Sequence, residues 1–87
     1  MNKFIHELKI YPKYFEEVMN GNKTFEVRKN DRHFKVGDAI VLNEWDNIKY
    51  TGRKIHAVIT YILDDTFIGL EKGYVAFAFA VMRMEPN

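Results

Sequence analysis

The sequence predicts an α+β, mainly β domain: a small β-barrel of about five to six strands with one short helix after the first strand. Several segments alternate apolar and polar side chains with the period of two that is typical of half-buried strands. One early segment instead spaces its apolar residues three and four apart, as on one face of a helix. The chain has 87 residues, enough for a single domain over 1–87. So many strands in so short a chain favour a closed or nearly closed barrel.

The first two elements are a strand and the helix. Residues 5–10 alternate, and His6 shares a face with apolar side chains, so we expect a partly buried, hydrogen-bonded histidine. Pro12 fits the first turn of a helix, where its missing N–H leaves no bond unmade. Gly21 suits the left-handed conformation that ends a helix. The apolar stripe of this helix is expected to be held by packing, and it comprises Tyr11, Tyr14, Phe15, Val18 and Met19.

The remaining elements are predicted to be strands joined by loops. Residues 23–29 alternate, and we expect Phe25 and Val27 to point into the core. Two segments, 46–52 and 64–73, are predicted as loops, the second with one helical turn around 67–70. In the last strand large apolar residues alternate with alanines, so both of its faces are expected to be buried. The strands after the second one are predicted at residues 39–45, 53–63 and 74–82.

Composition excludes several classes of protein. The hydrophobic content of 47% excludes intrinsic disorder. With no cysteine, the chain has no disulfide, no thiolate nucleophile and no Cys-type zinc site. The histidines lack metal-ligand spacing and no Gly-rich phosphate loop is present, so neither a metal nor a cofactor is expected. The chain begins without the apolar segment of a signal peptide, and its longest apolar run is too short to span a bilayer. We therefore expect a cytoplasmic protein with no membrane partner.

Charge is concentrated in one segment although the whole chain carries only +1. Residues 23–35 contain five positive and two negative side chains, and five minus two gives a local +3. Such a segment can concentrate an anionic ligand at one face of the protein. The alternative is an ordinary solvated loop of mixed charge.

The same segment opens with a polar motif, Gly21-x-Lys23-Thr24-x-Glu26-x-Arg28. Residues two apart lie about 6.6–7 Å apart along a strand, so Glu26 and Arg28 can contact each other or share a ligand. A paired carboxylate leaves arginine donors free for a phosphate or the edge of a base. The alternative is an ion pair on a solvated face, worth about 0–1 kcal/mol.

Two aromatic residues, Trp45 and Tyr50, flank the polar loop 46–52. They can form a platform on which an unpaired base stacks. Alternatively, these rings complete a small hydrophobic core.

The motif Gly21-x-Lys23-Thr24-x-Glu26-x-Arg28, which follows a short helix, resembles that of the ASCH domains of the PUA-like superfamily. Further likeness lies in Val36-Gly37-Asp38, Glu44-Trp45-Asp46 and Tyr50-Thr51-Gly52-Arg53, and together they are similar to a branch of short, uncharacterised bacterial and phage proteins. The resemblance implies a PUA-like barrel with a cleft between helix and sheet, and RNA or a nucleotide as the ligand. Carried over by position, the residues lining that cleft would be Lys23, Thr24, Glu26 and Arg28.

The leading hypothesis is therefore a nucleic-acid-binding module, a monomer or a weak homodimer. Lys23 and Arg28 would contact a phosphate or a base edge, and Glu26 would accept hydrogen bonds from a base or orient Arg28. Arg32 would belong to an outer positive rim, and Trp45 would stack on a base.

Two other classes of function stay open, a hydrolase and a protein-interaction module. One ASCH branch removes the acetyl group from N4-acetylcytidine with a lysine, a nucleophilic threonine and a glutamate. The resemblance places that lysine at Lys23 and the threonine at Glu26, and Glu71 is the only candidate for the glutamate. A carboxylate does not replace a hydroxyl nucleophile, although Glu26 can activate water while Lys23 stabilises an oxyanion.

Overall fold

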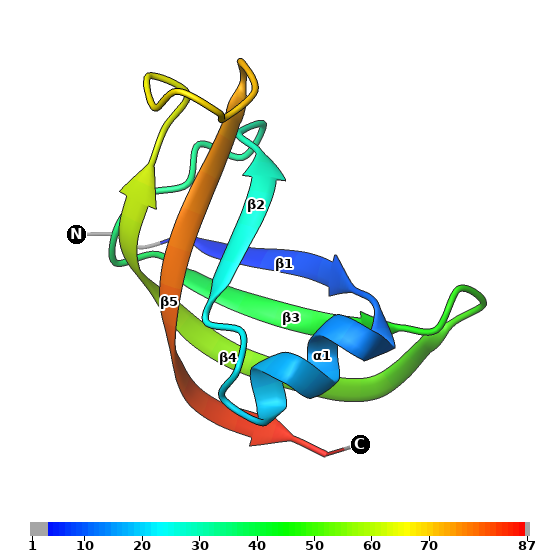
Figure 1. Ribbon diagram of the computed structural model, residues 1–87. Helices are drawn as coiled ribbons and strands as arrows, with labels where there is room; N and C mark the ends of the chain where they lie inside the picture. The colour runs from blue at the N-terminus through cyan, green and yellow to red at the C-terminus, as the bar shows by residue number, and fades with distance from the viewer. Residues whose placement is uncertain (1–3, 87) are drawn as a thin grey trace.

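The protein consists of one five-stranded sheet and one short helix, as predicted (Figure 1). The structure, a computed structural model, describes residues 4–86. The elements in chain order are β1 (Ile5–Ile10), α1 (Pro12–Met19), β2 (Phe25–Lys29), β3 (Ala39–Trp45), β4 (Tyr50–Leu63) and β5 (Tyr74–Glu85). The fold class read from the sequence is thus confirmed: mainly β, with the helix directly after the first strand.

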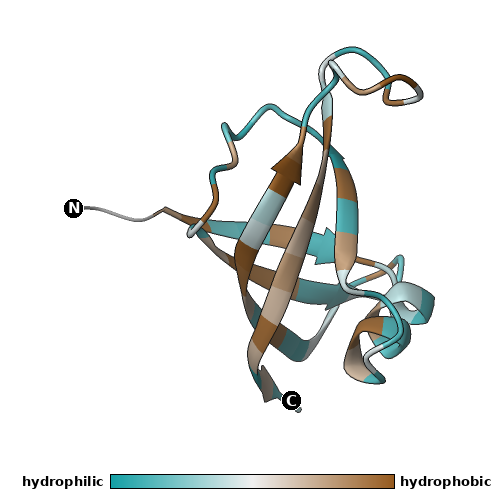
Figure 2. Ribbon diagram, turned by 60° about the vertical axis from the view of Figure 1, so that its left-hand side comes forward, coloured by the Kyte–Doolittle hydropathy of each residue, from teal (hydrophilic) through white to brown (hydrophobic). Residues whose placement is uncertain are grey.

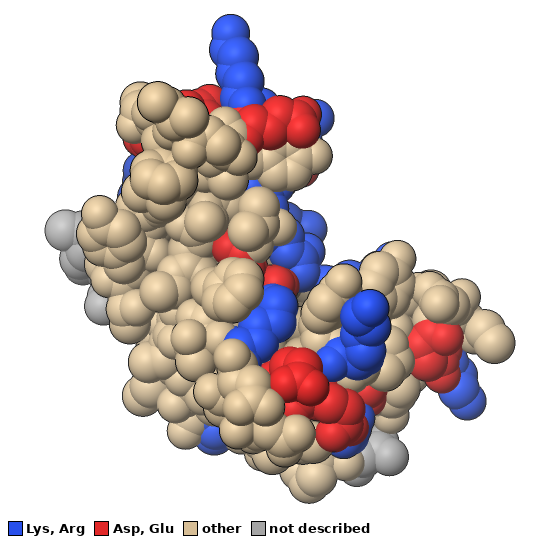
Figure 3. Space-filling view, viewed as in Figure 1, with Lys and Arg blue, Asp and Glu red and all other residues tan. Residues whose placement is uncertain are grey.

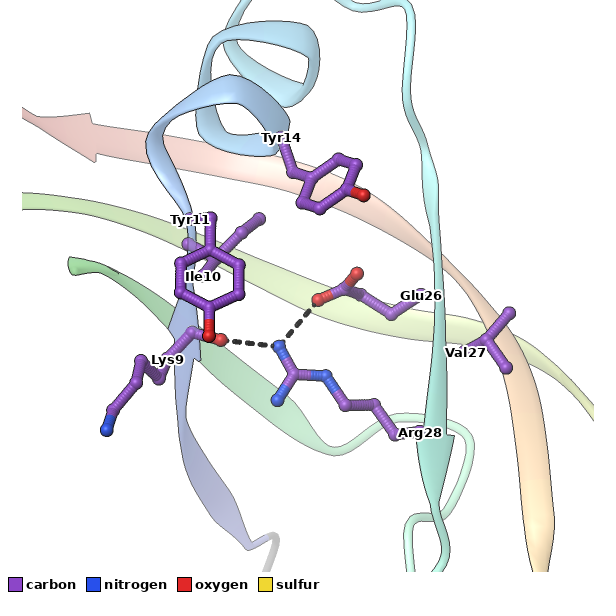
Figure 4. Close-up of a pocket in the computed structure, with 7 residues that line it drawn as sticks. All are labelled: Lys9, Ile10, Tyr11, Tyr14, Glu26, Val27 and Arg28. Atoms are coloured by element: carbon purple, nitrogen blue, oxygen red, sulfur yellow. Dashed lines mark hydrogen bonds and ion pairs between the residues drawn. The ribbon is translucent and has the colours of Figure 1, made fainter. Parts of the chain in front are cut away.

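The sheet curls into a half-barrel. Its strand order is β1-β3-β4-β5-β2, with β1 and β3 parallel and the other neighbours antiparallel. The register between β4 and β5 shifts twice, and such irregularities bend and twist a sheet, as the curvature of these long strands in Figure 1 shows. β1 and β2 are consequently the two edges of the sheet. Between these edges lies an open seam, and α1 follows directly from β1 there (Figures 1 and 4).

The core fills the inside of the curl, and Figure 2 shows hydrophobic and hydrophilic residues alternating along the strands. α1 contributes two buried side chains, Phe15 and Val18, to this core. The other apolar residues of this core come from β1, β3, β4, β5 and one loop: Leu8, Ile10, Phe34, Ile40, Leu42, Ile55, Ala57, Ile59, Val75, Phe77 and Phe79.

The helix begins and ends as its sequence predicts, but only part of its apolar stripe is buried. Pro12 occupies the first turn, and Gly21 lies just beyond the end with φ +81°. Tyr11 and Tyr14, at the N-terminal end of the helix, are about half exposed. The other residues of the expected stripe are buried or half-buried: Phe15, Val18 and Met19. The prediction was wrong for these two tyrosines because the N-terminal turn of α1 lies beside the open seam, not over the core.

The facing of β2 is the reverse of the prediction. Phe25 and Val27 are about half exposed, whereas only 7% of Glu26 is accessible to solvent. Glu26 pairs with the buried Phe77 of β5, and Phe25 pairs with Ala78 on the outer face. The polar side goes inward because Glu26 finds cationic partners there, which removes the penalty of burying an unpaired carboxylate.

Three smaller expectations also need correction. The alanine face of β5 is not buried: Ala76 and Ala78 are half-buried and Ala80 is exposed, because no described element packs over this outer face. β4 starts earlier than predicted, at Tyr50, because the loop between β3 and β4 is only a tight turn, and β5 continues to Glu85 because its end pairs with β4. Residues 67–70 form a turn and no helix.

Candidate functional site

A hollow of about 380 Å³ lies in the open seam between the edges of the sheet. We call it the seam cleft. One wall comes from the end of β1 and the first turn of α1, and the other from β2 (Figure 4). The residues that line it are Lys9, Ile10, Tyr11, Tyr14, Glu26, Val27 and Arg28.

Glu26 is the centre of an ionic chain on the β2 wall. Arg28 donates from Nη2 to Glu26 Oε2 at 2.8 Å, and Lys23 donates from Nζ to Oε1. Lys23 also donates to the carbonyl of Phe25 at 2.7 Å. Both oxygens of the buried carboxylate therefore have a cationic partner, the arrangement that a buried charge requires. Lys23, Glu26 and Arg28 therefore meet as predicted, but of the three only Glu26 and Arg28 line the seam cleft.

Arg28 also connects the two edges of the sheet. Its Nη2 donates to the backbone carbonyl of Lys9 at 2.7 Å, so a side chain joins β2 to β1 where no strand pairing does (Figure 4). Among residues 4–86, Nη1 and Nε make no hydrogen bond, and the side chain is 27% exposed. The guanidinium is thus held in place with donors to spare, the geometry that favours an oxyanion such as phosphate.

Two tyrosines form the aromatic wall of the cleft. Both residues line the cleft from the start of α1; the Tyr14 ring extends toward Glu26, and the Tyr11 ring lies alongside β1 (Figure 4). Lys23 Nζ lies 5.7 Å from the centre of the Tyr14 ring. Sequence reasoning missed both residues because it assigned them to the core. The available signal was the phenol hydroxyl, which favours a position where one end of the ring stays wet.

The other predicted ligand-binding residues do not join the seam cleft. Thr24 lines a separate, mainly apolar groove beside Val18 and Met19. Arg32 is exposed in the loop after β2. The ring centres of Trp45 and Tyr50 lie 4.9 Å apart in an edge-on contact. Lys9 Nζ lies 4.3 Å from the centre of the Trp45 ring.

The residues proposed for a hydrolase are also not all together. Lys23 and Glu26 are in contact, but Glu71 is exposed in the loop before β5. The hydrogen bond of Asn30 to Gly73 places that loop at the far end of β2 from Lys23. Lys23 and Asn30 are seven residues apart, which corresponds to about 23 Å of extended chain. The three groups therefore cannot act on one bond in this conformation.

A second ionic network, which sequence reasoning missed, fastens α1 to the sheet. Only 3% of Glu44 is exposed, and Arg53 donates to its two oxygens at 2.7 and 2.8 Å. Arg53 also donates to Glu16 at 2.8 Å, and its guanidinium lies 4.6 Å from the centre of the Phe15 ring. The hydrogen bond from Arg53 holds the pKa of Glu44 below its usual range, and both carboxylates raise the pKa of Arg53. All these groups are already engaged with one another, so their role is structural.

His6 occupies the environment that its position in the strand predicts. It is buried and its Nε2 lies 2.8 Å from Asp38 Oδ2, which also accepts the N–H of Lys35. Within residues 4–86, no three side chains of the metal-ligating types gather where they could hold an ion.

The described part of the chain contains no helix long and apolar enough to cross a membrane.

Comparison with known proteins identifies the family. The model of a family described as "Domain of unknown function (DUF3850)" matches residues 5–79. A curated relative, the "Uncharacterized 12.9 kDa protein in GpA 3'region" of Escherichia phage P2, is 47% identical over 60 residues. Those residues are 69% of this chain and 55% of the relative, so the match spans about half the length of that protein. Because the family model covers every element from β1 to the middle of β5, the chain belongs to the DUF3850 family.

Proposed function

We propose that this protein binds RNA or a nucleotide-like ligand in the seam cleft. The observation that carries the proposal is the position of Arg28, fixed across the cleft by Lys9 and Glu26 with Nε and Nη1 still free among the described residues. A guanidinium that is already oriented loses little freedom when it binds a phosphate. The tyrosines on the opposite wall offer rings for a base.

Charge around the cleft supports an anionic ligand. Figure 3 shows positive side chains in the middle of this face, with acidic side chains beside them and over α1. Within the ionic chain, Lys23 and Arg28 outnumber Glu26 by two charges to one, so the net charge at the cleft is positive. Contacts between such groups and phosphates release counterions, so binding should weaken steeply as salt rises.

The pairing of Glu26 favours binding over hydrolysis. A general base needs an accessible lone pair directed at the proton it takes, whereas Glu26 is only 7% exposed and each of its oxygens already accepts a hydrogen bond from a cation. In this proposal Glu26 orients Arg28 and Lys23 toward the ligand. A relationship to ASCH domains is part of the same proposal and rests on the Lys-Thr-x-Glu-x-Arg motif.

The test measures binding of short RNA oligonucleotides at about 50 and 200 mM salt. We expect Arg28→Ala to reduce affinity at least tenfold, and Tyr14→Leu to reduce it by about 1–3 kcal/mol, the value of one base stacked on one ring. Lys54→Ala is the matched control, because Lys54 belongs to another hollow, with Glu7, Asn43 and Tyr50.

The result depends on a folded Arg28 variant, since this side chain also joins the sheet edges. Circular dichroism shows whether Arg28→Ala is folded. If it is not, Tyr14→Leu still tests the proposal, because it leaves the ionic chain intact. Equal losses in Arg28→Ala and Lys54→Ala, affinity independent of salt, or no binding by the wild type would each overturn the proposal.

A further inference from the structure

A second hollow adjoins the seam cleft on the other side of the same tyrosines. It has a volume of about 410 Å³ and lies between the start of α1 and the turn that joins β3 to β4. Its lining consists of Tyr11, Pro12, Lys13, Tyr14 and Asn47, so it shares both tyrosines with the seam cleft. The two phenol rings are therefore the partition between neighbouring hollows.

The hollows match each other in size and in chemistry. Volumes of about 380 and 410 Å³ lie at the lower end of the range for small-ligand sites, large enough for one nucleotide each. Each hollow has an aromatic face and a positive group: Arg28 in the seam cleft and Lys13 in the second hollow. Lys13 Nζ lies 5.2 Å from the centre of the Tyr14 ring, so its charge sits beside the shared partition.

Single-stranded nucleic acid repeats this combination along its length, because every nucleotide contributes one phosphate and one base. Proteins bind such strands by stacking successive bases on aromatic rings while cationic groups contact the backbone. A duplex does not fit this arrangement, since its bases are already stacked and paired.

We propose that the two hollows bind two successive nucleotides of a single strand, one on each side of the tyrosine partition. Arg28 faces the phosphate of one nucleotide and Lys13 that of the other. This inference rests on the proposed function and extends it, because it names a strand of at least two nucleotides as the ligand in place of a mononucleotide. It also gives a function to Tyr11, Lys13 and Asn47, which lie outside the Lys-Thr-x-Glu-x-Arg motif.

Asn47 allows the second hollow to be altered without disturbing the fold. It lies in the β3–β4 turn with φ +80°, a conformation that glycine adopts without strain. The turn itself is held by Asp46, whose carboxylate accepts the N–H groups of Ile48 and Lys49. Asn47→Gly therefore removes an amide from the hollow and keeps the turn.

The experiment compares AMP with the dinucleotide pApA, in ribose and deoxyribose forms, by following backbone amide shifts in NMR titrations at low salt. We expect wild-type protein to bind pApA at least fivefold more tightly than AMP, the gain from stacking one further base. Lys13→Ala and Asn47→Gly should weaken pApA more than AMP and so reduce this preference. Arg28→Ala should weaken both ligands, and Lys54→Ala neither.

The outcomes separate this inference from the proposed function. Equal affinity for AMP and pApA would overturn the two-nucleotide reading and leave the seam cleft as a mononucleotide site. Equal weakening of both ligands by Lys13→Ala would overturn it as well, since Lys13 would then belong to a single common site. Failure of wild-type protein to bind either ligand would overturn both proposals. A preference for pApA in either sugar form that Lys13→Ala abolishes would support the inference.

Discussion

Replacing Arg53 with methionine tests whether the second ionic network holds α1 on the sheet. Methionine keeps most of the side-chain length and packs well in irregular apolar surroundings. The substitution removes two hydrogen bonds to Glu44 and one to Glu16, together with the contact to the Phe15 ring. Glu44 would remain buried with the hydroxyl of Thr51 as its remaining side-chain partner.

The size of the loss follows from this burial. Removing one partner from a buried ion pair costs about 3–5 kcal/mol, because the other charge stays desolvated. Arg53 is 28% exposed, so water can partly replace it and the lower end, about 3 kcal/mol, is expected. In a domain of this size that loss lowers Tm by roughly 12–24 °C.

The pH dependence gives this prediction a second, independent readout. In the wild type the hydrogen bond from Arg53 lowers the pKa of Glu44, so its stabilisation is full above the ordinary carboxyl pKa. That stabilisation is lost as pH falls through the lowered pKa. Without Arg53, burial raises the pKa of Glu44 above its ordinary value, and protonation then relieves the penalty in mild acid. The difference between the two proteins should therefore narrow between pH 7 and about pH 4.

Urea unfolding followed by circular dichroism measures both effects. The proteins compared are the wild type, Arg53→Met and the double variant Arg53→Met/Glu44→Gln, at pH 7 and about pH 4.5. The double variant should be more stable than Arg53→Met at pH 7, because no unpaired charge remains buried. A loss below about 1 kcal/mol in Arg53→Met at pH 7, or an equal loss at both pH values, would refute the structural role of the network.

Three further predictions concern the facing of β2, the buried histidine and the end of β5. Val27→Thr should change stability by less than about 0.5 kcal/mol in urea unfolding, whereas Phe77→Ala should cost about 3–5 kcal/mol; similar losses would contradict the outward facing of β2. His6→Ala should cost about 1–3 kcal/mol in the same assay, because it leaves a buried carboxylate without this partner. The hydrogen bond from His56 lowers the pKa of Glu85, so His56→Ala should raise the titration midpoint of that carboxyl in NMR. In the wild type, the stabilising effect of Glu85 should be lost as pH falls through its lowered pKa.

Periodicity predicted the elements of the fold well because local sequence determines them. Alternation identified β1, β2, β4 and β5, and Pro12 and Gly21 marked the two ends of the helix. Periodicity does not determine which side of a strand faces inward. In the five residues of β2, only two are large and apolar, and the pairing of Glu26 with Phe77 of a distant strand decides the orientation.

The candidate site was predictable only where it is local. Lys23, Glu26 and Arg28 lie within one short segment, so strand spacing alone brings two of them into contact. The carbonyl of Lys9 and the ring of Tyr14 reach the cleft through the curl of the whole sheet, which no local pattern encodes. Conversely, Glu71 and Trp45 lie elsewhere, and no pattern of residue types could have shown this.

The position of the site follows from the incomplete closure of the barrel. At the seam β1 and β2 do not pair, and Arg28 bridges them in place of a backbone ladder. An unpaired edge exposes polar groups that need partners, so a cationic side chain there satisfies a structural need and keeps further donors for a ligand. A phosphate that takes these donors would also fix the guanidinium between the two edges. Because the guanidinium that joins the two edges would also hold the ligand, a ligand of the cleft should raise the stability of the whole half-barrel.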